Sequence, residues 1–224
     1  MSVVDAQAIQ RGARGATVAT KLKLERLKLQ PDHRITFLKG FLRNPQRVGS
    51  VLPSSRFMER RLIEAADVSH ARQIVELGPG TGGITRAMLS ALPNDAALLA
   101  IEINPRFVSL LRSNRDPRLH VHLGSAERIQ NACAIHGFDA PEVVLSGIPF
   151  STMPDASARR LIRAAWTALA PGGRFIAYQF RDRVAVIGGQ LLGPPEVDME
   201  LRNVPPMRIY TWRKSRQEQA AAGG

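Results

Sequence analysis

Cysteine and long apolar runs are scarce in this chain of 224 residues. Its one cysteine, Cys133, excludes a disulfide within the chain and fits a reducing compartment such as the cytoplasm. The longest nearly apolar runs, such as residues 96–101, are far shorter than the ~20 residues that a bilayer span needs. The N-terminus also lacks the apolar core of a signal peptide. We therefore expect a protein that is soluble or peripheral to a membrane.

Acidic residues are also few, 19 against 31 basic ones, which gives a net charge of +12. The excess is concentrated at the start of the chain. Residues 1–60 hold twelve Lys and Arg and four acids, a net charge of +8. This balance predicts an anionic partner, either nucleic acid or an acidic membrane surface, that meets a basic N-terminal arm.

The length and a hydrophobic content of 44% suit one α/β domain with a short extension. We place the extension at residues 1–45, the domain at 46–216 and a disordered tail at 217–224. The extension is predicted to hold two helices, residues 18–30 and 32–43. Apolar and basic side chains of the first helix are expected to meet a membrane: Leu22, Leu29, Lys21, Lys23, Arg26 and Lys28. Alternatively, the helices pack on the domain and leave a solvated basic face.

Strands and helices alternate through the rest of the sequence. Strands are predicted at 73–77, 97–101, 119–123, 142–145 and 174–180, and helices at 56–66, 84–92, 106–113, 126–135 and 157–169. This order favours a mostly parallel sheet with helices on both faces. Two further runs, 200–204 and 207–212, are predicted to form a hairpin that adds an antiparallel edge and brings the sheet to seven strands.

The most informative segment is residues 74–83, in which a buried strand leads into a glycine-rich turn that opens a helix. Such a turn brings backbone N–H groups close to a nucleotide-like cofactor. The residues expected to bind it here are Glu76, Gly78, Gly80, Thr81 and Gly82. Glu102 ends the next strand, 24 residues after Gly78, where a carboxylate can accept hydrogen bonds from both ribose hydroxyls. The alternative is that the glycines only pack helix against strand.

Three further positions extend this prediction to S-adenosylmethionine. Ile103 follows the ribose acid, and Ser125 with Ala126 follows the third strand, where an adenine edge could be read. An acid on the first strand, Glu76, could hold the amino group of a methionine moiety. The arrangement resembles the class I S-adenosylmethionine-dependent methyltransferases, whose fold is Rossmann-like.

Residues 146–150, Ser-Gly-Ile-Pro-Phe, end the fourth strand, where methyltransferases present the acceptor atom. The run resembles the Asn-(Leu/Ile)-Pro-(Tyr/Phe) motif of the rRNA adenine dimethylases, with Ser-Gly where those enzymes need Asn. A weakly nucleophilic adenine amine needs polar acceptors, whereas an alkyl amine needs only deprotonation and an in-line approach. The sequence therefore favours an alkyl amine acceptor. A rigid turn with a core aromatic is the alternative for Pro149 and Phe150.

Beyond this motif, the likeness to a known family covers residues 37–213. It rests on Phe41-Leu42-Arg43-Asn44-Pro45, on residues 48–55 (Val-Gly-Ser-Val-Leu-Pro-Ser-Ser), on the two motifs above and on Asn203-Val204-Pro205-Pro206. The chain resembles the soluble bacterial phospholipid N-methyltransferases of the PmtA type.

The resemblance implies methyl transfer from S-adenosylmethionine to phosphatidylethanolamine and its mono- and dimethyl forms, leading to phosphatidylcholine, with S-adenosylhomocysteine as the other product. It also implies docking on the anionic inner face of the cytoplasmic membrane, with no metal and no stable nucleic-acid partner.

Several side chains are candidates for handling the lipid. Ser146, the backbone near Ile148 or the hydroxyl of Tyr178 could orient the amine while water takes its proton. Ser146 is also expected to contact the cofactor. Tyr178 and Phe150 could form an aromatic wall for a methylated cation. Contacts with the rest of the substrate are expected from Ser54, Ser55, Pro149, Arg181 and Arg183. The five histidines are expected to be structural or on the surface.

Three other functions remain open at this point. One is an RNA adenine-N6 methyltransferase whose basic charge follows phosphates, although little chain follows residue 214 for a second domain. Another is a small-molecule methyltransferase tethered to a membrane by its basic arm. The third is a scaffold that binds the cofactor without catalysis, which the intact glycines and carboxylates argue against.

Overall fold

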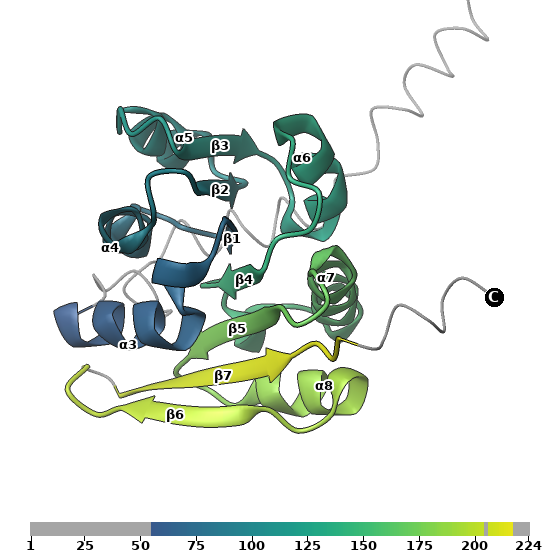
Figure 1. Cartoon of the computed structure of the whole chain (residues 1–224). Helices are drawn as coiled ribbons and strands as arrows, with labels where there is room; N and C mark the ends of the chain where they lie inside the picture. Colours follow the sequence, from purple (N-terminus) through teal and green to yellow (C-terminus); the bar gives the residue numbers. More distant parts are fainter. Residues whose placement is uncertain (1–54, 204–205, 217–224) are drawn as a thin grey trace, which may run out of the picture. The chain divides into compact units, whose positions relative to one another are not determined.

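A computed structural model describes residues 55–203 and 206–216 (Figure 1). The predicted helices 18–30 and 32–43, their six membrane residues, Ser54 and the tail 217–224 lie outside the described residues. Within the described part, no helix is long and apolar enough to span a membrane.

Within residues 55–203 and 206–216, seven strands form one mixed sheet in the order β3-β2-β1-β4-β5-β7-β6. The strands are β1 (Gln73–Leu77), β2 (Ala97–Glu102), β3 (Leu119–Leu123), β4 (Val143–Ser146), β5 (Arg174–Gln179), β6 (Glu196–Glu200) and β7 (Met207–Arg213). The first five run parallel, and β7 lies antiparallel between β5 and β6. The predicted Rossmann-like fold with an antiparallel edge is therefore confirmed.

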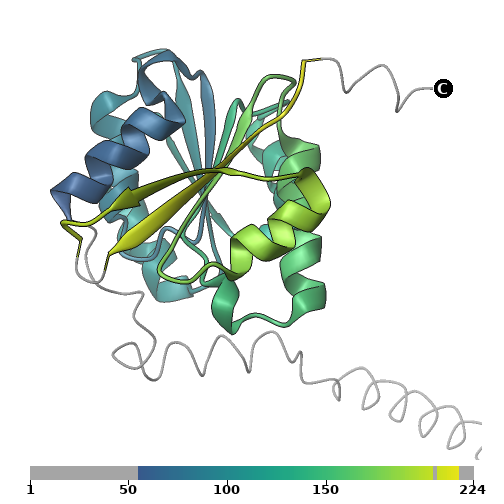
Figure 2. The same ribbon diagram turned by 90° about the horizontal axis from the view of Figure 1, so that it is seen from below.

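Helices cover both faces of this sheet (Figures 1 and 2). The α-helices are α3 (Arg56–Ala66), α4 (Gly83–Ala91), α5 (Pro105–Arg112), α6 (Ile129–His136), α7 (Asp155–Ala168) and α8 (Arg183–Leu192). Short 3-10 turns are η1 (Val68–His70), η2 (Ala126–Arg128) and η3 (Phe150–Thr152). Figure 1 shows α3, α4 and α5 on one side of the sheet and α6, α7 and α8 on the other.

Each side of the sheet has its own core. The first cluster packs α3 and α4 on inward residues of the central strands, such as Ile74 and Leu145. The second packs α6, α7 and α8 on the opposite residues, such as Val75 and Val144. The alternation of neighbouring strand residues between the two clusters explains why β1 and β4 are apolar along their whole length.

Local sequence signals set the helix boundaries. Ser55 accepts a hydrogen bond from the backbone N–H of Met58 and caps α3. Asn104 caps α5 in the same way, and Pro105 occupies the first turn, where its missing N–H costs nothing. Gly82, in the left-handed region at φ 77°, begins α4.

The C-terminal third differs from the prediction in two places. The prediction of a strand at 200–204 is wrong, because β6 spans Glu196–Glu200 and a turn follows it. The buried Glu200 carboxylate explains the stop, since it accepts hydrogen bonds from both the backbone and the side chain of Arg202. Helix α8 was not predicted at all, because its two adjacent glycines, Gly188 and Gly189, mask a helical pattern.

The strand order indicates which edge of the sheet binds a ligand. The chain runs outward from β1 through β2 to β3, then crosses back to β4 on the other side of β1. Ligands of open α/β sheets bind at the carboxyl ends of strands where the order reverses in this way. The ends of β1, β2 and β4 are therefore the place to look for a site.

Candidate active site

In the turn after β1, the backbone lies close to the side chain of Ile148. Gly78 has φ 70°, and a Cβ built on it would lie 2.7 Å from Cγ1 of Ile148. Gly80 also has a positive φ, but a Cβ there would meet no atom within 4 Å. The loop is therefore packed against the β4 turn on one side and open at Gly80, where the backbone can approach a ligand.

Glu76 is a fully buried carboxylate beneath this loop. Its Oε2 accepts a 2.6 Å hydrogen bond from the hydroxyl of Thr85 on α4, while its Oε1 is buried without a partner. Burial raises the pKa of Glu76 to about 7, the Thr85 hydrogen bond opposes this shift, and the charge of Glu102 adds to it. An unsatisfied buried acceptor of this kind is where a ligand ammonium would bind.

Glu102 ends β2 and faces the same loop. Its Oε2 accepts a 3.1 Å bond from the N–H of Gly80, and its Oε1 accepts 2.8 Å bonds from the N–H groups of Ile103 and Asn104. Burial raises its pKa, and these three backbone bonds oppose that shift. The carboxylate is thus held in place beside the open glycine, as a ribose-binding acid requires.

The end of β3 completes this side of the site. Ser125 accepts a 3.3 Å hydrogen bond from the N–H of Glu127 and caps the turn η2, whose first residue, Ala126, is buried. Thr81 of the glycine loop is exposed, and its carbonyl accepts a bond from Arg86. The predicted cofactor residues therefore converge on the carboxyl ends of β1, β2 and β3, as parallel topology demands.

Ser146 and Phe150, which the sequence predicts together at the acceptor site, lie on either side of the turn after β4. Ser146 is fully buried on the α6–α8 side of the sheet, paired with Leu77 and Ala177, and its Oγ accepts a 3.4 Å bond from the N–H of Ile148. The expectation that Phe150 walls the acceptor site needs correcting. Its side chain is fully buried in the α7–α8 core, so the alternative of a rigid turn with a core aromatic describes it.

Gln179 holds that turn and was missed from the sequence. Its Nε2 donates a 2.8 Å bond to the Ile148 carbonyl, and its Oε1 accepts a 3.3 Å bond from the N–H of Phe150. One lone pair of the carbonyl expected to orient the amine is therefore already used. The available signal was a polar residue at an inward position of an otherwise apolar strand. Thr85 gives a comparable signal on α4, as a polar residue on the buried face of a helix.

Tyr178 lies on the α3–α4 side of the sheet, together with Glu76. A Cβ built on Gly147 would fall 2.3 Å from the Tyr178 hydroxyl oxygen and 3.3 Å from the Gly78 carbonyl oxygen. The tyrosine hydroxyl thus occupies the space of a side chain at position 147. Burial first, and the Glu76 charge second, raise the pKa of Tyr178, so the hydroxyl keeps its proton and cannot act as a base at neutral pH.

The residues predicted to contact the substrate are scattered around this edge. Arg181 is exposed just beyond β5, whereas Arg183 begins α8 and forms an ion pair with Asp155 of α7. Ser55 uses its hydroxyl to cap α3, and its N–H donates to Asn203 at 3.3 Å. The Pro149 carbonyl accepts bonds from both the backbone and the hydroxyl of Thr152. Ser54 lies outside the described residues.

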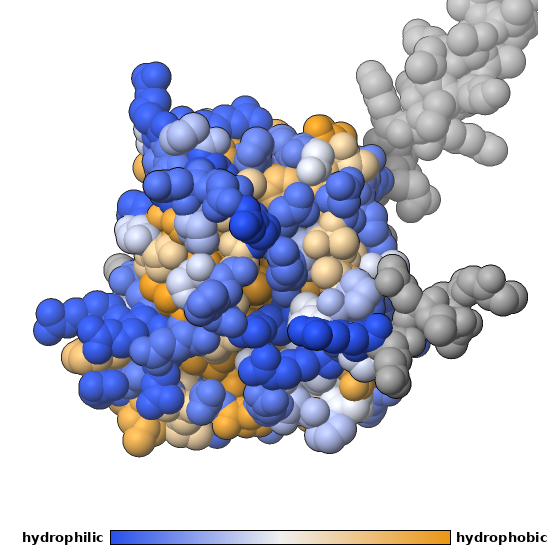
Figure 3. Space-filling model, in the orientation of Figure 1, coloured by the Kyte–Doolittle hydropathy of each residue, from blue (hydrophilic) through white to orange (hydrophobic). Residues whose placement is uncertain are grey.

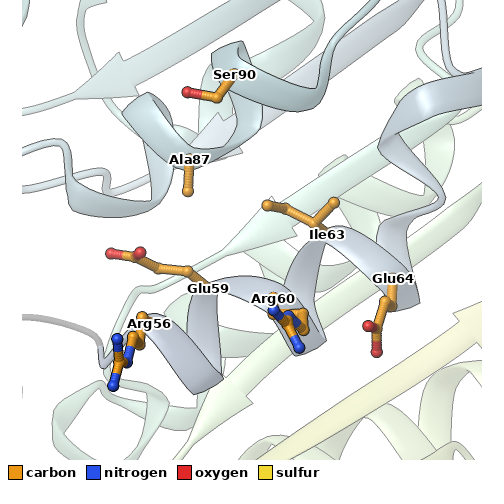
Figure 4. A pocket seen from close by; sticks show the side chains of 7 residues that line it. All are labelled: Arg56, Glu59, Arg60, Ile63, Glu64, Ala87 and Ser90. Carbon is orange, nitrogen blue, oxygen red and sulfur yellow. The ribbon is translucent and has the colours of Figure 1, made fainter.

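A groove of about 530 Å³ separates α3 from α4 (Figure 4). Its walls are Arg56, Glu59, Arg60, Ile63, Glu64, Ala87 and Ser90. Two arginines and two glutamates leave it without net charge, and Glu59 points across it toward α4 in Figure 4. The groove adds no residue to the predicted site.

The donors and acceptors on this edge fit S-adenosylmethionine. The unpartnered oxygen of Glu76 suits the amino group, the fixed carboxylate of Glu102 suits the ribose hydroxyls, and the open side of Gly80 leaves space along the loop. Fold and site together define a class I S-adenosylmethionine-dependent methyltransferase.

Comparisons with known proteins agree with this class and narrow it. The family described as "Methyltransferase domain" matches residues 74–173. An ornithine lipid N-methyltransferase of Singulisphaera acidiphila is 30% identical over 191 residues, which cover 79% of this chain and 94% of that protein. The chain belongs to the lipid N-methyltransferases of this superfamily.

Two other similarities either cover a smaller part of the chain or have a lower sequence identity. The ribosomal RNA small subunit methyltransferase A of Caulobacter vibrioides is 35% identical over 95 residues, 41% of this chain and 34% of that protein. An RNA methyltransferase of Salinibacter ruber, solved with S-adenosyl-L-homocysteine, aligns with a TM-score of 0.52 at 18% identity, covering 74% of this chain and 95% of that one. At that identity the likeness shows the fold.

Proposed function

We propose that this enzyme methylates the primary amine of phosphatidylethanolamine and then its mono- and dimethyl forms. The observation that supports this most is the Tyr178 hydroxyl above Gly147, at the end of β4. It offers one neutral hydrogen-bond acceptor beside the cofactor loop, which suits an alkyl amine. Repeated methylation is compatible with it, because a single acceptor contact can be given up as N–H groups are replaced.

In the proposed reaction, the residues of the chain have the following roles. S-adenosylmethionine supplies an electrophilic methyl group on a sulfonium. Glu76 and Glu102 fix the two ends of the cofactor site, and Ile148 and Gly78 pack the acceptor turn against its loop. Tyr178 orients the amine, which loses its proton to water. Most of the acceleration then comes from positioning.

The same geometry argues against an adenine acceptor. When Ile148-Pro149-Phe150 is aligned with the adenine dimethylase motif, Gly147 takes the position of the asparagine. A Cβ at Gly147 would clash with the tyrosine hydroxyl, so an asparagine carboxamide cannot enter without moving Tyr178. The similarity to the Caulobacter rRNA enzyme spans about a third of that protein, which is consistent with a shared cofactor half alone.

Ornithine lipid is a second candidate acceptor, favoured by the similarity to the Singulisphaera acidiphila enzyme. It also presents a primary alkyl amine, but it carries no phosphate. For the phospholipid, the guanidinium of the exposed Arg181 could pair with the phosphate.

The basic extension, residues 1–45, is proposed to bring the enzyme to the inner face of the cytoplasmic membrane. Its support is the net charge of +8 within residues 1–60. Reversible binding of one or two amphipathic helices to anionic lipid suits an enzyme that must visit many substrate molecules.

The test uses the full-length protein, labelled S-adenosylmethionine and two sets of phosphatidylglycerol vesicles, one with phosphatidylethanolamine and one with ornithine lipid. Label in mono-, di- or trimethylated phosphatidylethanolamine supports the proposal, and Arg181→Ala should then raise the apparent KM for that lipid. Label in ornithine lipid alone selects the second candidate. Label in neither lipid, with cofactor binding intact, refutes both.

A further inference from the structure

Three exposed apolar residues lie beside the candidate site, at the end of the sheet formed by β5, β7 and β6. Phe180 is 50% exposed, Met199 42% and Leu201 68%. Met199 lies opposite Arg208, and Arg208 lies opposite Gln179, so these residues form one row across three strands. Phe180 is the next residue after Gln179, and Leu201 is two residues after Met199. Because neighbouring strands are ~4.8 Å apart, the row spans about 10 Å.

Arginines lie among these apolar side chains. The Arg208 guanidinium donates a 3.0 Å hydrogen bond to the Phe180 carbonyl. The Arg202 guanidinium stacks 4.2 Å from the ring centroid of Phe57, at the start of α3. The exposed Arg181 adds a third cation, next to Phe180. The space-filling view shows hydrophobic surface interleaved with hydrophilic surface over the region of α3 and β6 (Figure 3).

We call Phe180, Met199, Leu201, Arg202 and Arg208 the rim. It adjoins the acceptor site, since Phe180 is two residues after Tyr178 and Ile209, the neighbour of Arg208, is the cross-strand partner of Tyr178. An amine carried by a membrane lipid can reach Tyr178 only if this end of the sheet meets the head-group layer. Exposed apolar side chains with arginines between them have the chemistry to enter that layer.

We propose that the rim is a membrane-docking surface of the catalytic domain itself, which inserts into an anionic bilayer independently of the N-terminal extension. The proposal rests on the lipid acceptor described above. Phe180, Met199 and Leu201 bury apolar area among the acyl-chain ends, and Arg208 pairs with lipid phosphates. Arg202, whose Nε and Nη2 already bond the Glu200 carboxylate, lies at the same surface. This arrangement points the end of β4 at the bilayer, so that a head group enters the site without leaving the membrane.

The chain offers a matched control on the opposite end of the sheet. Ile135 is 61% exposed in the last turn of α6. Helices that connect parallel strands run back along the sheet, so this turn lies at the amino ends of the strands, away from the acceptor site. Ile135→Ser removes one exposed apolar side chain, as Leu201→Ser does, from a surface that the proposal keeps in water.

The test compares full-length wild-type protein, the double variant F180S/L201S and Ile135→Ser in flotation with pure phosphatidylglycerol vesicles. Loss of two inserted side chains should weaken partitioning about tenfold or more, while Ile135→Ser should match wild type. Calorimetric titration with S-adenosylhomocysteine should give the same affinity for all three proteins, which shows that the fold and the cofactor site survive.

Unchanged flotation of F180S/L201S, or an equal loss for Ile135→Ser, overturns the proposal. A variant with impaired S-adenosylhomocysteine binding is replaced by Leu201→Ser alone, because Leu201 lies in a turn and is 68% exposed. The vesicles contain no amine lipid, so the result does not depend on which lipid is methylated. Failure of methyl transfer to phosphatidylethanolamine and failure of rim docking are therefore separate outcomes.

Discussion

At the scale of single residues, the buried carboxylate of Glu76 lowers the stability of the fold but provides a partner for a ligand ammonium. Its pKa rises from an ordinary 4.5 to about 7 in the fold, so the folded protein holds an extra proton between these values. The free energy of unfolding must therefore fall as pH rises across that window, by ~3 kcal/mol in total. Above pH 7 the buried charge remains as a cost, and a bound ammonium would offset it.

We predict that Glu76→Gln raises the free energy of unfolding relative to wild type, with a gain that grows from pH 5 to pH 8, because glutamine does not ionise. Urea denaturation at several pH values measures this gain, and parallel pH profiles for the two proteins would contradict it. The same variant should bind S-adenosylhomocysteine about tenfold more weakly, or worse, at pH 8, since the amino group loses its charged partner.

Gly147 and Tyr178 should be strongly coupled. Gly147→Ala places a methyl group against the tyrosine hydroxyl and ring, so we expect a loss of about 1–3 kcal/mol in the free energy of unfolding and a severe loss of methyl transfer. Tyr178→Ala opens that space, so adding Gly147→Ala to it should cost much less stability. A double-mutant cycle measures the coupling, and additive effects would show that the hydroxyl lies elsewhere.

Tyr178→Phe tests the hydroxyl itself. It should slow methyl transfer more than it weakens cofactor binding, because the phenol contacts the amine and not the cofactor in the proposed arrangement. Single-turnover rates at saturating cofactor measure the first effect, and calorimetric titration measures the second. Equal rates for the two proteins would remove the hydroxyl from the reaction.

At the scale of elements, helix α8 packs on β7 through a glycine. A Cβ on Gly188 would lie 2.4 Å from the Trp212 ring, whereas a Cβ on the next residue, Gly189, would meet nothing within 4 Å. We predict that Gly188→Ala lowers the free energy of unfolding by about 1–3 kcal/mol. Gly189→Ala should raise it by roughly 0.5–1 kcal/mol through helix propensity. Thermal and urea unfolding of the pair measure both signs, and equal effects would refute the contact.

The same helix shows where prediction from the sequence failed. Buried, nearly continuous apolar strands such as residues 97–102 and sharp cap residues such as Ser55 can be recognised locally, and those elements were predicted correctly. Helix α8 and the end of β6 depend on contacts far along the chain. Gly188 is tolerated because Trp212 fills its surface, and β6 ends at Glu200, which meets Arg61 of the distant helix α3.

The candidate site divides in a similar way. Glu76, Glu102 and the glycine turn could be identified because their spacing follows the strand-turn-helix unit itself. Thr85 and Gln179 stand out only as polar residues at inward positions, and their roles come from partners on other elements. The sequence could not show that Ser146 and Tyr178 face opposite sides of the sheet, because that depends on the register between β4 and β5.

At the scale of the whole molecule, charge and catalysis are separated along the chain. Residues 1–60 carry +8 of the net +12, while the two acids of the cofactor site lie in the less basic remainder. Binding to an anionic surface should therefore depend on the first part, and cofactor affinity on the second. The rim adds apolar contacts at the catalytic edge, whose contribution does not weaken with salt as that of the basic extension does.

We predict that deleting residues 1–30 weakens flotation with phosphatidylglycerol vesicles most strongly at low salt and leaves S-adenosylhomocysteine affinity unchanged. As salt rises, screening of the basic extension should bring wild type toward the deletion variant, and the remaining binding should be lost in F180S/L201S. Flotation across a salt series, with all three proteins in parallel, measures this convergence. Equal flotation of wild type and the deletion variant at low salt would show that the extension does not contribute to docking.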